Sequence, residues 1–207
     1  MRVQRQPVNA ALLSGLGLAL LTLLFFGWLA EEALAGRTAA FDMLVRGDVH
    51  RLASPALTRV MRALTLLGSA PFLIALALFL IARWRRQGRK RLIIVFLVTM
   101  LGAIALDAAL KLVFHRPRPV PFFGLTAPAS SSFPSGHALM SCCFYGVLAG
   151  VMARGRWWPW AAAALLVAGI GLSRIYLGVH YPSDVIAGYA AAVVWVLAVR
   201  SACYFVL

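Results

Sequence analysis

Residues 70–114 read APFLIALALFLIARWRRQGRKRLIIVFLVTMLGAIALDAALKLVF, and this stretch decides the fold class. Two apolar runs flank the basic segment RWRRQGRKR at 83–91, and each approaches the roughly 20 residues that a helix needs to cross a bilayer. The runs are apolar on every face and do not alternate, which favours membrane helices over barrel strands. A short basic turn between two such helices is typical of the cytoplasmic side.

Runs of the same kind recur outward from this stretch along the chain. Six segments qualify, at about 8–30, 63–82 (with a start as early as 55), 92–114, 135–153, 159–177 and 182–205. The first is too long for the core of a signal peptide, which has about 7–15 residues. We therefore predict an all-α, polytopic membrane protein, a bundle of six transmembrane helices that forms one domain over residues 1–207.

The composition supports this class and excludes others. Of the 207 residues, 62% are apolar and 13% are charged, against about 45–50% and about 25% in soluble proteins. These values argue against a disordered chain, a coiled coil and an ordinary cytosolic enzyme. The three cysteines show no CxxC spacing and no cluster with histidine, so we expect neither a zinc site nor a disulfide framework.

The net charge of +14 is explained by topology. Eleven of the 20 basic residues, and none of the six acids, lie in the N-terminal tail, in 83–91, in 154–156 and at Arg200. The positive-inside rule places these segments and both termini in the cytoplasm, and leaves 31–62, 115–134 and 178–182 outside. The charge is therefore not a nucleic-acid footprint. The loop 31–62 fits an amphipathic interfacial helix and a solvated linker equally well.

Three polar groups lie on the predicted outer side: KLVFHRPRP at 111–119, FPSGH at 133–137 and SRIYLGVHYPSD at 173–184. Polar residues in or against a bilayer are costly and are therefore candidates for function. Because the predicted topology brings all three groups to one membrane face, we expect a single site there, at the extracytoplasmic surface.

The residue types of these groups indicate phosphate chemistry. Lys111, Arg118 and Arg174 supply positive charge, and arginine can hold phosphate oxygens in a bidentate manner. Ser135 and Gly136 resemble a helix start, where free backbone amides bind anions.

Two histidines and an acid complete the set. His137 and His180 offer a proton donor and a nucleophile, and Asp184 follows His180 by one helical turn, where it could orient the imidazole. Each signal alone has an ordinary structural explanation, such as a snorkelling lysine or an ion pair between Arg174 and Asp184. Their joint occurrence on one face favours a site.

Three further residues have open roles. Asp107 lies one turn before Lys111 and is interpreted either as a partner that positions this lysine or as part of a structural salt bridge. His115 and Arg116 lie inside the first group, where they could touch the leaving group or lipid headgroups.

The three groups resemble the signature of the type 2 phosphatidic acid phosphatase family, whose site is similar to that of vanadium haloperoxidases. Every signature position is matched, over residues 111–184. The resemblance implies that His180 is the nucleophile, that Asp184 orients it, and that His137 protonates the leaving oxygen and later helps to activate water. It also implies that five residues hold the phosphate, namely Lys111, Arg118, Ser135, Gly136 and Arg174.

The resemblance further implies a membrane-embedded lipid phosphatase that works through a phosphohistidine. The implied substrates are a polyprenyl pyrophosphate, phosphatidate, phosphatidylglycerol phosphate or lipid A phosphates. We expect no metal or other cofactor, because three side-chain cations can replace magnesium, and no nucleic-acid partner. The expected partners are the lipid phosphate and the bilayer, in a bacterial inner membrane; the sequence does not address the oligomeric state. The alternatives are a phosphotransferase that uses a second lipid as acceptor, a non-catalytic lipid-phosphate binder or transporter, and a haloperoxidase.

Overall fold

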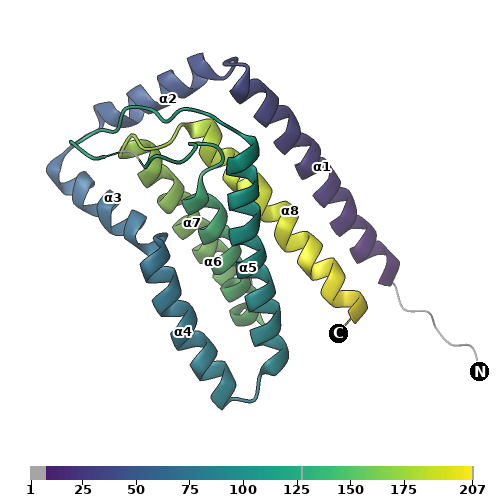
Figure 1. Cartoon of the computed structure of the whole chain (residues 1–207). Helices are drawn as coiled ribbons and strands as arrows, with labels where there is room; N and C mark the ends of the chain where they lie inside the picture. The colour runs from purple at the N-terminus through teal and green to yellow at the C-terminus, as the bar shows by residue number, and fades with distance from the viewer. Residues whose placement is uncertain (1–7, 127, 207) are drawn as a thin grey trace, which may run out of the picture.

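The computed structural model describes residues 8–126 and 128–206, with side chains from 13 to 202. This part of the chain forms eight α-helices and no strand, which confirms the predicted all-α class. The helices are α1 (Val8–Leu34), α2 (Ala39–Arg51), α3 (Pro55–Leu67), α4 (Ala70–Arg86), α5 (Lys90–Val113), α6 (Gly136–Ala153), α7 (Trp158–Tyr176) and α8 (Pro182–Val206). Figure 1 shows α2 lying across one end of a bundle made by the others.

Five single helices in the described residues are long and apolar enough to cross a membrane, namely α1, α5, α6, α7 and α8. A sixth span is reached when α3 and α4 count as one, with a bend of 50° between them. The expected continuous helix over 63–82 is therefore wrong in detail. Ser69 has an extended backbone and Pro71 lies in the first turn of α4. Since proline has no amide to donate to the preceding turn, α4 starts as a new helix.

The loop 31–62 contains a helix, α2, so the first of its two interpretations holds. Asp42 and Arg46 point inward and are 0% and 8% exposed, whereas Met43 and Leu44 on the outer side are 59% and 63% exposed. An apolar outer face suits a helix that lies in the membrane interface. The polar face of α2 thus covers the end of the bundle.

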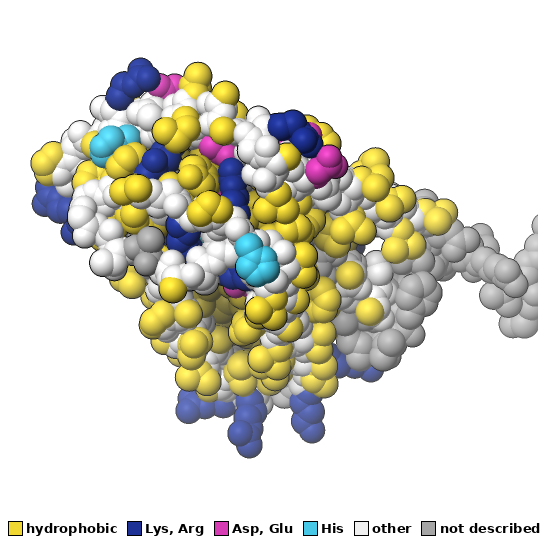
Figure 2. Space-filling view, turned by 45° about the horizontal axis from the view of Figure 1, so that its top comes forward, with side chains coloured by type: hydrophobic (Ala, Val, Ile, Leu, Met, Phe, Trp, Pro, Cys, Tyr) yellow, Lys and Arg dark blue, Asp and Glu magenta, His cyan; other side chains and the backbone are white. Residues whose placement is uncertain are grey.

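The two ends of the bundle differ in polarity. In Figure 1 the segment 114–135 and α2 lie at one end, and the turn between α4 and α5 lies at the other. Figure 2 shows an apolar band between a basic lower end and a mixed upper end. This arrangement fits the predicted topology. Arg2 and Arg5, which also support a cytoplasmic N-terminus, lie outside the described residues.

Close packing of α8 on its neighbours sets the positions of the site residues. Its alanines meet the C-terminal half of α1 in one buried cluster. At Gly188, an added Cβ would lie 2.6 Å from the carbonyl oxygen of Ser135, so only glycine lets α8 touch the start of α6. This contact supports a 2.9 Å hydrogen bond from the Ser135 amide to the Asp184 carbonyl.

Candidate active site

The fold brings the predicted residues together at the end covered by α2. Lys111 ends α5, His137 starts α6 and Arg174 ends α7, while His180 lies in the turn before α8. His137 interacts electrostatically with four of the predicted residues, namely Lys111, Arg118, Arg174 and His180. Residues far apart in sequence therefore share one charged site.

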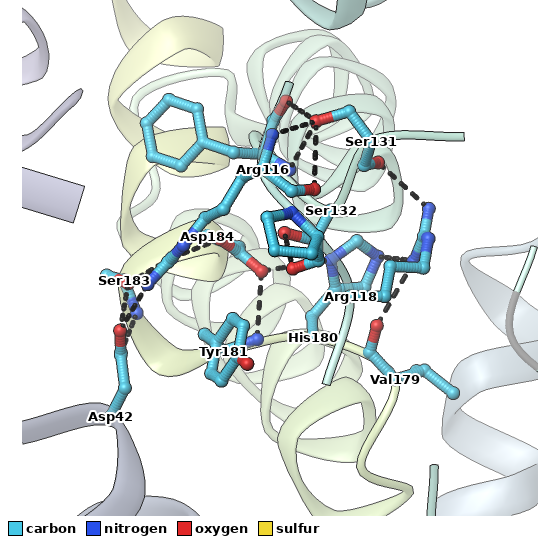
Figure 3. Close-up of polar contacts among 12 residues, drawn as sticks. Asp42, Arg116, Arg118, Ser131, Ser132, Val179, His180, Tyr181, Ser183 and Asp184 are labelled. Atoms are coloured by element: carbon cyan, nitrogen blue, oxygen red, sulfur yellow. Dashed lines mark hydrogen bonds and ion pairs between the residues drawn. The ribbon is translucent and has the colours of Figure 1, made fainter. Parts of the chain in front are cut away.

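His180 is almost fully buried and has a charged neighbour near each ring nitrogen. Its Nε2 lies 3.1 Å from Nη1 of Arg118, and its Nδ1 lies 3.5 Å from Oδ2 of Asp184. A guanidinium can only donate, so we infer that Nε2 carries the lone pair and Nδ1 the proton. This tautomer leaves Nε2 as the nucleophilic atom. Figure 3 shows His180 between Arg118 and Asp184.

Asp184 has two contacts that are shorter than its contact with His180. Its Oδ1 lies 2.5 Å from Nη1 of Arg116, and its Oδ2 accepts a 2.9 Å hydrogen bond from the Tyr181 amide. The carboxylate is fully buried. Arg116 thus contacts this acid rather than lying free for a leaving group or headgroup.

Lys111 and Asp107 form an ion pair of 2.8 Å, one turn apart on α5. The pair lies against Gly136, where an added Cβ would come 3.1 Å from both Nζ of Lys111 and Oδ1 of Asp107. Glycine at this position therefore lets the pair approach the first turn of α6. The Ser135 hydroxyl beside it is buried and has no hydrogen-bond partner, so it is free to meet a ligand.

Two arginines of the site make hydrogen bonds to neutral groups. Arg118 donates to backbone carbonyls of Ser130 and Val179, and Arg174 donates to Thr65 at 2.5 Å. In the described part of the chain neither arginine has an ion-pair partner. Burial lowers the pKa of Arg118. Two partly buried cations without a carboxylate in direct contact favour the binding of an anion.

An apolar groove opens beside the start of α6. It has a volume of about 560 Å³ between α4, α5 and α6, with Lys111, Gly136 and His137 at one end. Its lining along α4 runs from Ala70 to Ile81, a distance of about 16 Å at ~1.5 Å per residue. The walls are largely aliphatic and aromatic, so the groove fits a hydrocarbon chain.

A sequence profile of the PAP2 superfamily matches residues 92–205. The chain belongs to this superfamily. The resemblance to type 2 phosphatidic acid phosphatases is therefore confirmed. The profile covers the whole signature, residues 111–184, and begins after α2, α3 and α4.

The PAP2 fold is also found in solved structures. The transmembrane PAP2-type phosphatidylglycerolphosphate phosphatase from Bacillus subtilis superimposes with a TM-score of 0.84 at 26% identity, over 91% of this chain and 97% of that one. LpxE of Aquifex aeolicus gives a TM-score of 0.63 at 26% identity, over 77% and 94%. In sequence, phosphatidylglycerophosphatase B of Bacillus subtilis is 29% identical, over 81% of this chain and 85% of its own.

Sequence reasoning missed two contacts of this PAP2 site. Asp42 and Arg116 pair at 2.7 Å although they lie far apart in the chain, and Thr65 of α3 receives Arg174. Arg116 carried a signal, since it stands inside a motif. Asp42 and Thr65 carried none that periodicity could detect, because their burial depends on how α2 and α3 pack.

The environment of His180 predicts the acid limb of the pH profile. Burial lowers the pKa of His180 from 6.5, and nearby Asp184 opposes this shift only in part. The predicted role of His180 as a nucleophile requires a neutral imidazole, so activity should persist to lower pH and kcat/KM should fall only below pH 6.5. The profile should be measured with two substrates whose phosphates differ in pKa. A limb caused by an enzyme group has the same midpoint pH for both substrates, whereas one caused by the substrate does not. An acid limb that lies well above pH 6.5 with both substrates would contradict the role of His180 as the nucleophile.

Proposed function

We propose that the protein is a membrane-embedded lipid phosphatase that removes a phosphate from a lipid phosphate or pyrophosphate. The observation that carries the proposal is the apolar groove of about 560 Å³ that has Lys111 and His137 at one end. A hydrocarbon tail in the groove would place its headgroup against Lys111 and His137. The related PAP2 proteins named above are lipid phosphatases, which supports the same conclusion.

The proposed reaction has two steps. Nε2 of His180 attacks phosphorus and forms an N–P bond while the P–O bond to the lipid breaks, and His137 gives its proton to the leaving oxygen. Water then attacks the phosphohistidine, with His137 accepting its proton, and phosphate leaves. Asp184 orients His180 throughout. Five residues hold the phosphate oxygens, through side chains or the helix start: Lys111, Arg118, Ser135, Gly136 and Arg174.

Positive side chains supply the electrostatic stabilisation in this scheme. Phosphoryl transfer passes through a loose transition state in which charge is spread over the equatorial oxygens. Arg118 and Arg174 carry charge without a carboxylate partner, and Lys111 adds a third cation. The proposal therefore includes turnover without a metal ion. It also places the site on the outer side of a bacterial inner membrane, with the termini in the cytoplasm.

A phosphate-release assay tests the proposed function. Purified protein in detergent micelles is given phosphatidate, phosphatidylglycerol phosphate and a polyprenyl pyrophosphate, each with and without EDTA. We expect free phosphate and the dephosphorylated lipid from at least one of them, at the same rate with EDTA. Labelled phosphate that appears on a second lipid would indicate a phosphotransferase, and no turnover of any lipid would overturn the proposal.

Narrowing the groove should impair long-chain substrates alone. Ala77 lines the groove, whereas Ala75, two residues earlier on α4, is exposed on the outside of the bundle. Ala77→Trp should raise KM for a long-chain lipid phosphate about tenfold, since it displaces part of the buried chain. A short, soluble phosphate ester should be unaffected, and Ala75→Trp serves as the matched control. Equal effects of the two variants would contradict a tail in this groove.

A further inference from the structure

Asp42 is a buried acid of α2 that the reaction scheme above does not use. It is 0% exposed and lies 141 residues before Ser183 in sequence. Its carboxylate accepts hydrogen bonds from the Thr38 hydroxyl at 2.8 Å, and from the amide and hydroxyl of Ser183 at 2.9 and 2.7 Å. It also pairs with Nη2 of Arg116 at 2.7 Å. Figure 3 shows this group beside Asp184.

Arg116 lies between two carboxylates. One of its terminal nitrogens meets Asp42 and the other meets Asp184, at 2.7 and 2.5 Å. Its guanidinium also stacks over the ring of Tyr181, with a distance of 4.4 Å to the centroid. Burial alone would lower the pKa of Arg116, but Asp184 and Asp42 together raise it. Arg116 therefore stays charged between the two acids.

The net charge of Asp42, Arg116 and Asp184 affects how well a positive charge on His180 is stabilised. Arg116 and Asp184 alone would form a neutral pair, and a neutral pair stabilises an imidazolium or a phosphohistidine cation poorly. Asp42 adds a second negative charge and brings Asp42, Arg116 and Asp184 to a net charge of −1. The side of the cluster that faces His180 is the Asp184 carboxylate.

We propose that Asp42 is a positioning residue which neutralises Arg116, so that Asp184 acts on His180 as a negative charge. The expected effect of Asp42 on turnover rests on the proposed function, whereas its expected effect on the pKa of His180 does not. Arg116 links the two acids, and α2 thereby becomes part of the electrostatic setting of the nucleophile as well as a cover for the bundle end.

The other charged or titratable groups that act on His180 are two arginines and a histidine. Arg118 from the loop and Arg174 from α7 lie near its ring and disfavour its charged form, and His137 from α6 also interacts with it. Asp184 is the acid that acts on His180. A change in the charge balance behind Asp184 should therefore be visible in the titration of His180.

The test measures the pKa of His180 by NMR in detergent micelles, with ¹⁵N-labelled histidine and with His180→Ala to assign the signal. Asp42→Asn leaves a net charge of zero and should lower this pKa by about one pH unit. Arg116→Gln leaves two acids and should raise it. The double variant restores a net charge of −1 and should return the pKa toward that of the wild type. Asp48→Asn, at an exposed acid of α2 that pairs with Arg51, is the control and should change nothing.

A purely structural role of Asp42 gives a different pattern. In that case the pKa would not follow the net charge, and the double variant would be no closer to the wild type than either single one. The proposal would be overturned if the pKa of His180 were the same in the wild type, the two single variants and the double variant. A pKa too low to measure in all four proteins counts as the same result. If Asp42→Asn does not fold, the comparison of wild type with Arg116→Gln and with the double variant still decides.

Turnover gives a second reading of the same variants. Asp42→Asn should lower kcat about tenfold with little change in KM, since the substrate does not contact Asp42, and the double variant should recover part of the loss. The titration needs no turnover. A wild type that releases no phosphate would therefore overturn the proposed function while the NMR result still judges the role of Asp42.

Discussion

Replacement of His180 by alanine is expected to lower kcat for phosphate release by about 10⁴-fold or more, because the proposed reaction passes through a phosphoryl group on His180. Nε2 of His180 is held beside Arg118 at 3.1 Å, in the tautomer that attack requires. Initial rates of phosphate release from the best lipid substrate, at saturating concentration, measure the loss. The effect should fall on kcat, since the phosphate contacts of the cations remain.

A matched control separates this effect from damage to the fold. His115 lies on the same outer segment, but its side chain is exposed. His115→Ala should retain wild-type activity within about twofold, as expected for a surface change. A His180→Ala protein that elutes and melts like the control, yet retains more than a tenth of the activity, would rule out His180 as the nucleophile.

Replacement of His137 by alanine should cost about 10²–10⁴-fold in turnover of a lipid phosphate ester, the range for a lost general acid or base. The lipid alcohol is a poor leaving group and needs the proton. A nitrophenolate does not, so the first step with 4-nitrophenyl phosphate should survive the substitution. Rapid mixing should then show a burst of nitrophenolate close to the enzyme concentration, followed by slow turnover. Loss of the burst would contradict the assignment of His137 as the acid of the first step.

The signature residues could be placed from sequence because helix ends follow from the length of the apolar runs. Lys111 had to lie at the outer end of its helix, and Asp107 one turn before it had to face the same way. The observed 2.8 Å pair agrees with that geometry. The starts of α6 and α8 likewise followed from Pro134 and Pro182.

What could not be predicted depends on packing between distant segments. Arg116 reaches Asp42 and Asp184, which lie 74 and 68 residues away, and no periodicity relates such positions. The inward face of α2 was also hidden, because an interfacial helix can bury either its polar or its apolar side until its neighbours are known. The break before α4 was missed since apolar composition alone does not mark it.

The most direct measurement is to trap the phosphorylated enzyme. Protein is mixed with a lipid phosphate labelled at phosphorus, quenched in alkali within milliseconds, digested and analysed by mass spectrometry. The account predicts an acid-labile, alkali-stable phosphate on the peptide that contains His180, and none in His180→Ala. Phosphate release without any label on the protein, or label on a residue other than His180, would contradict it.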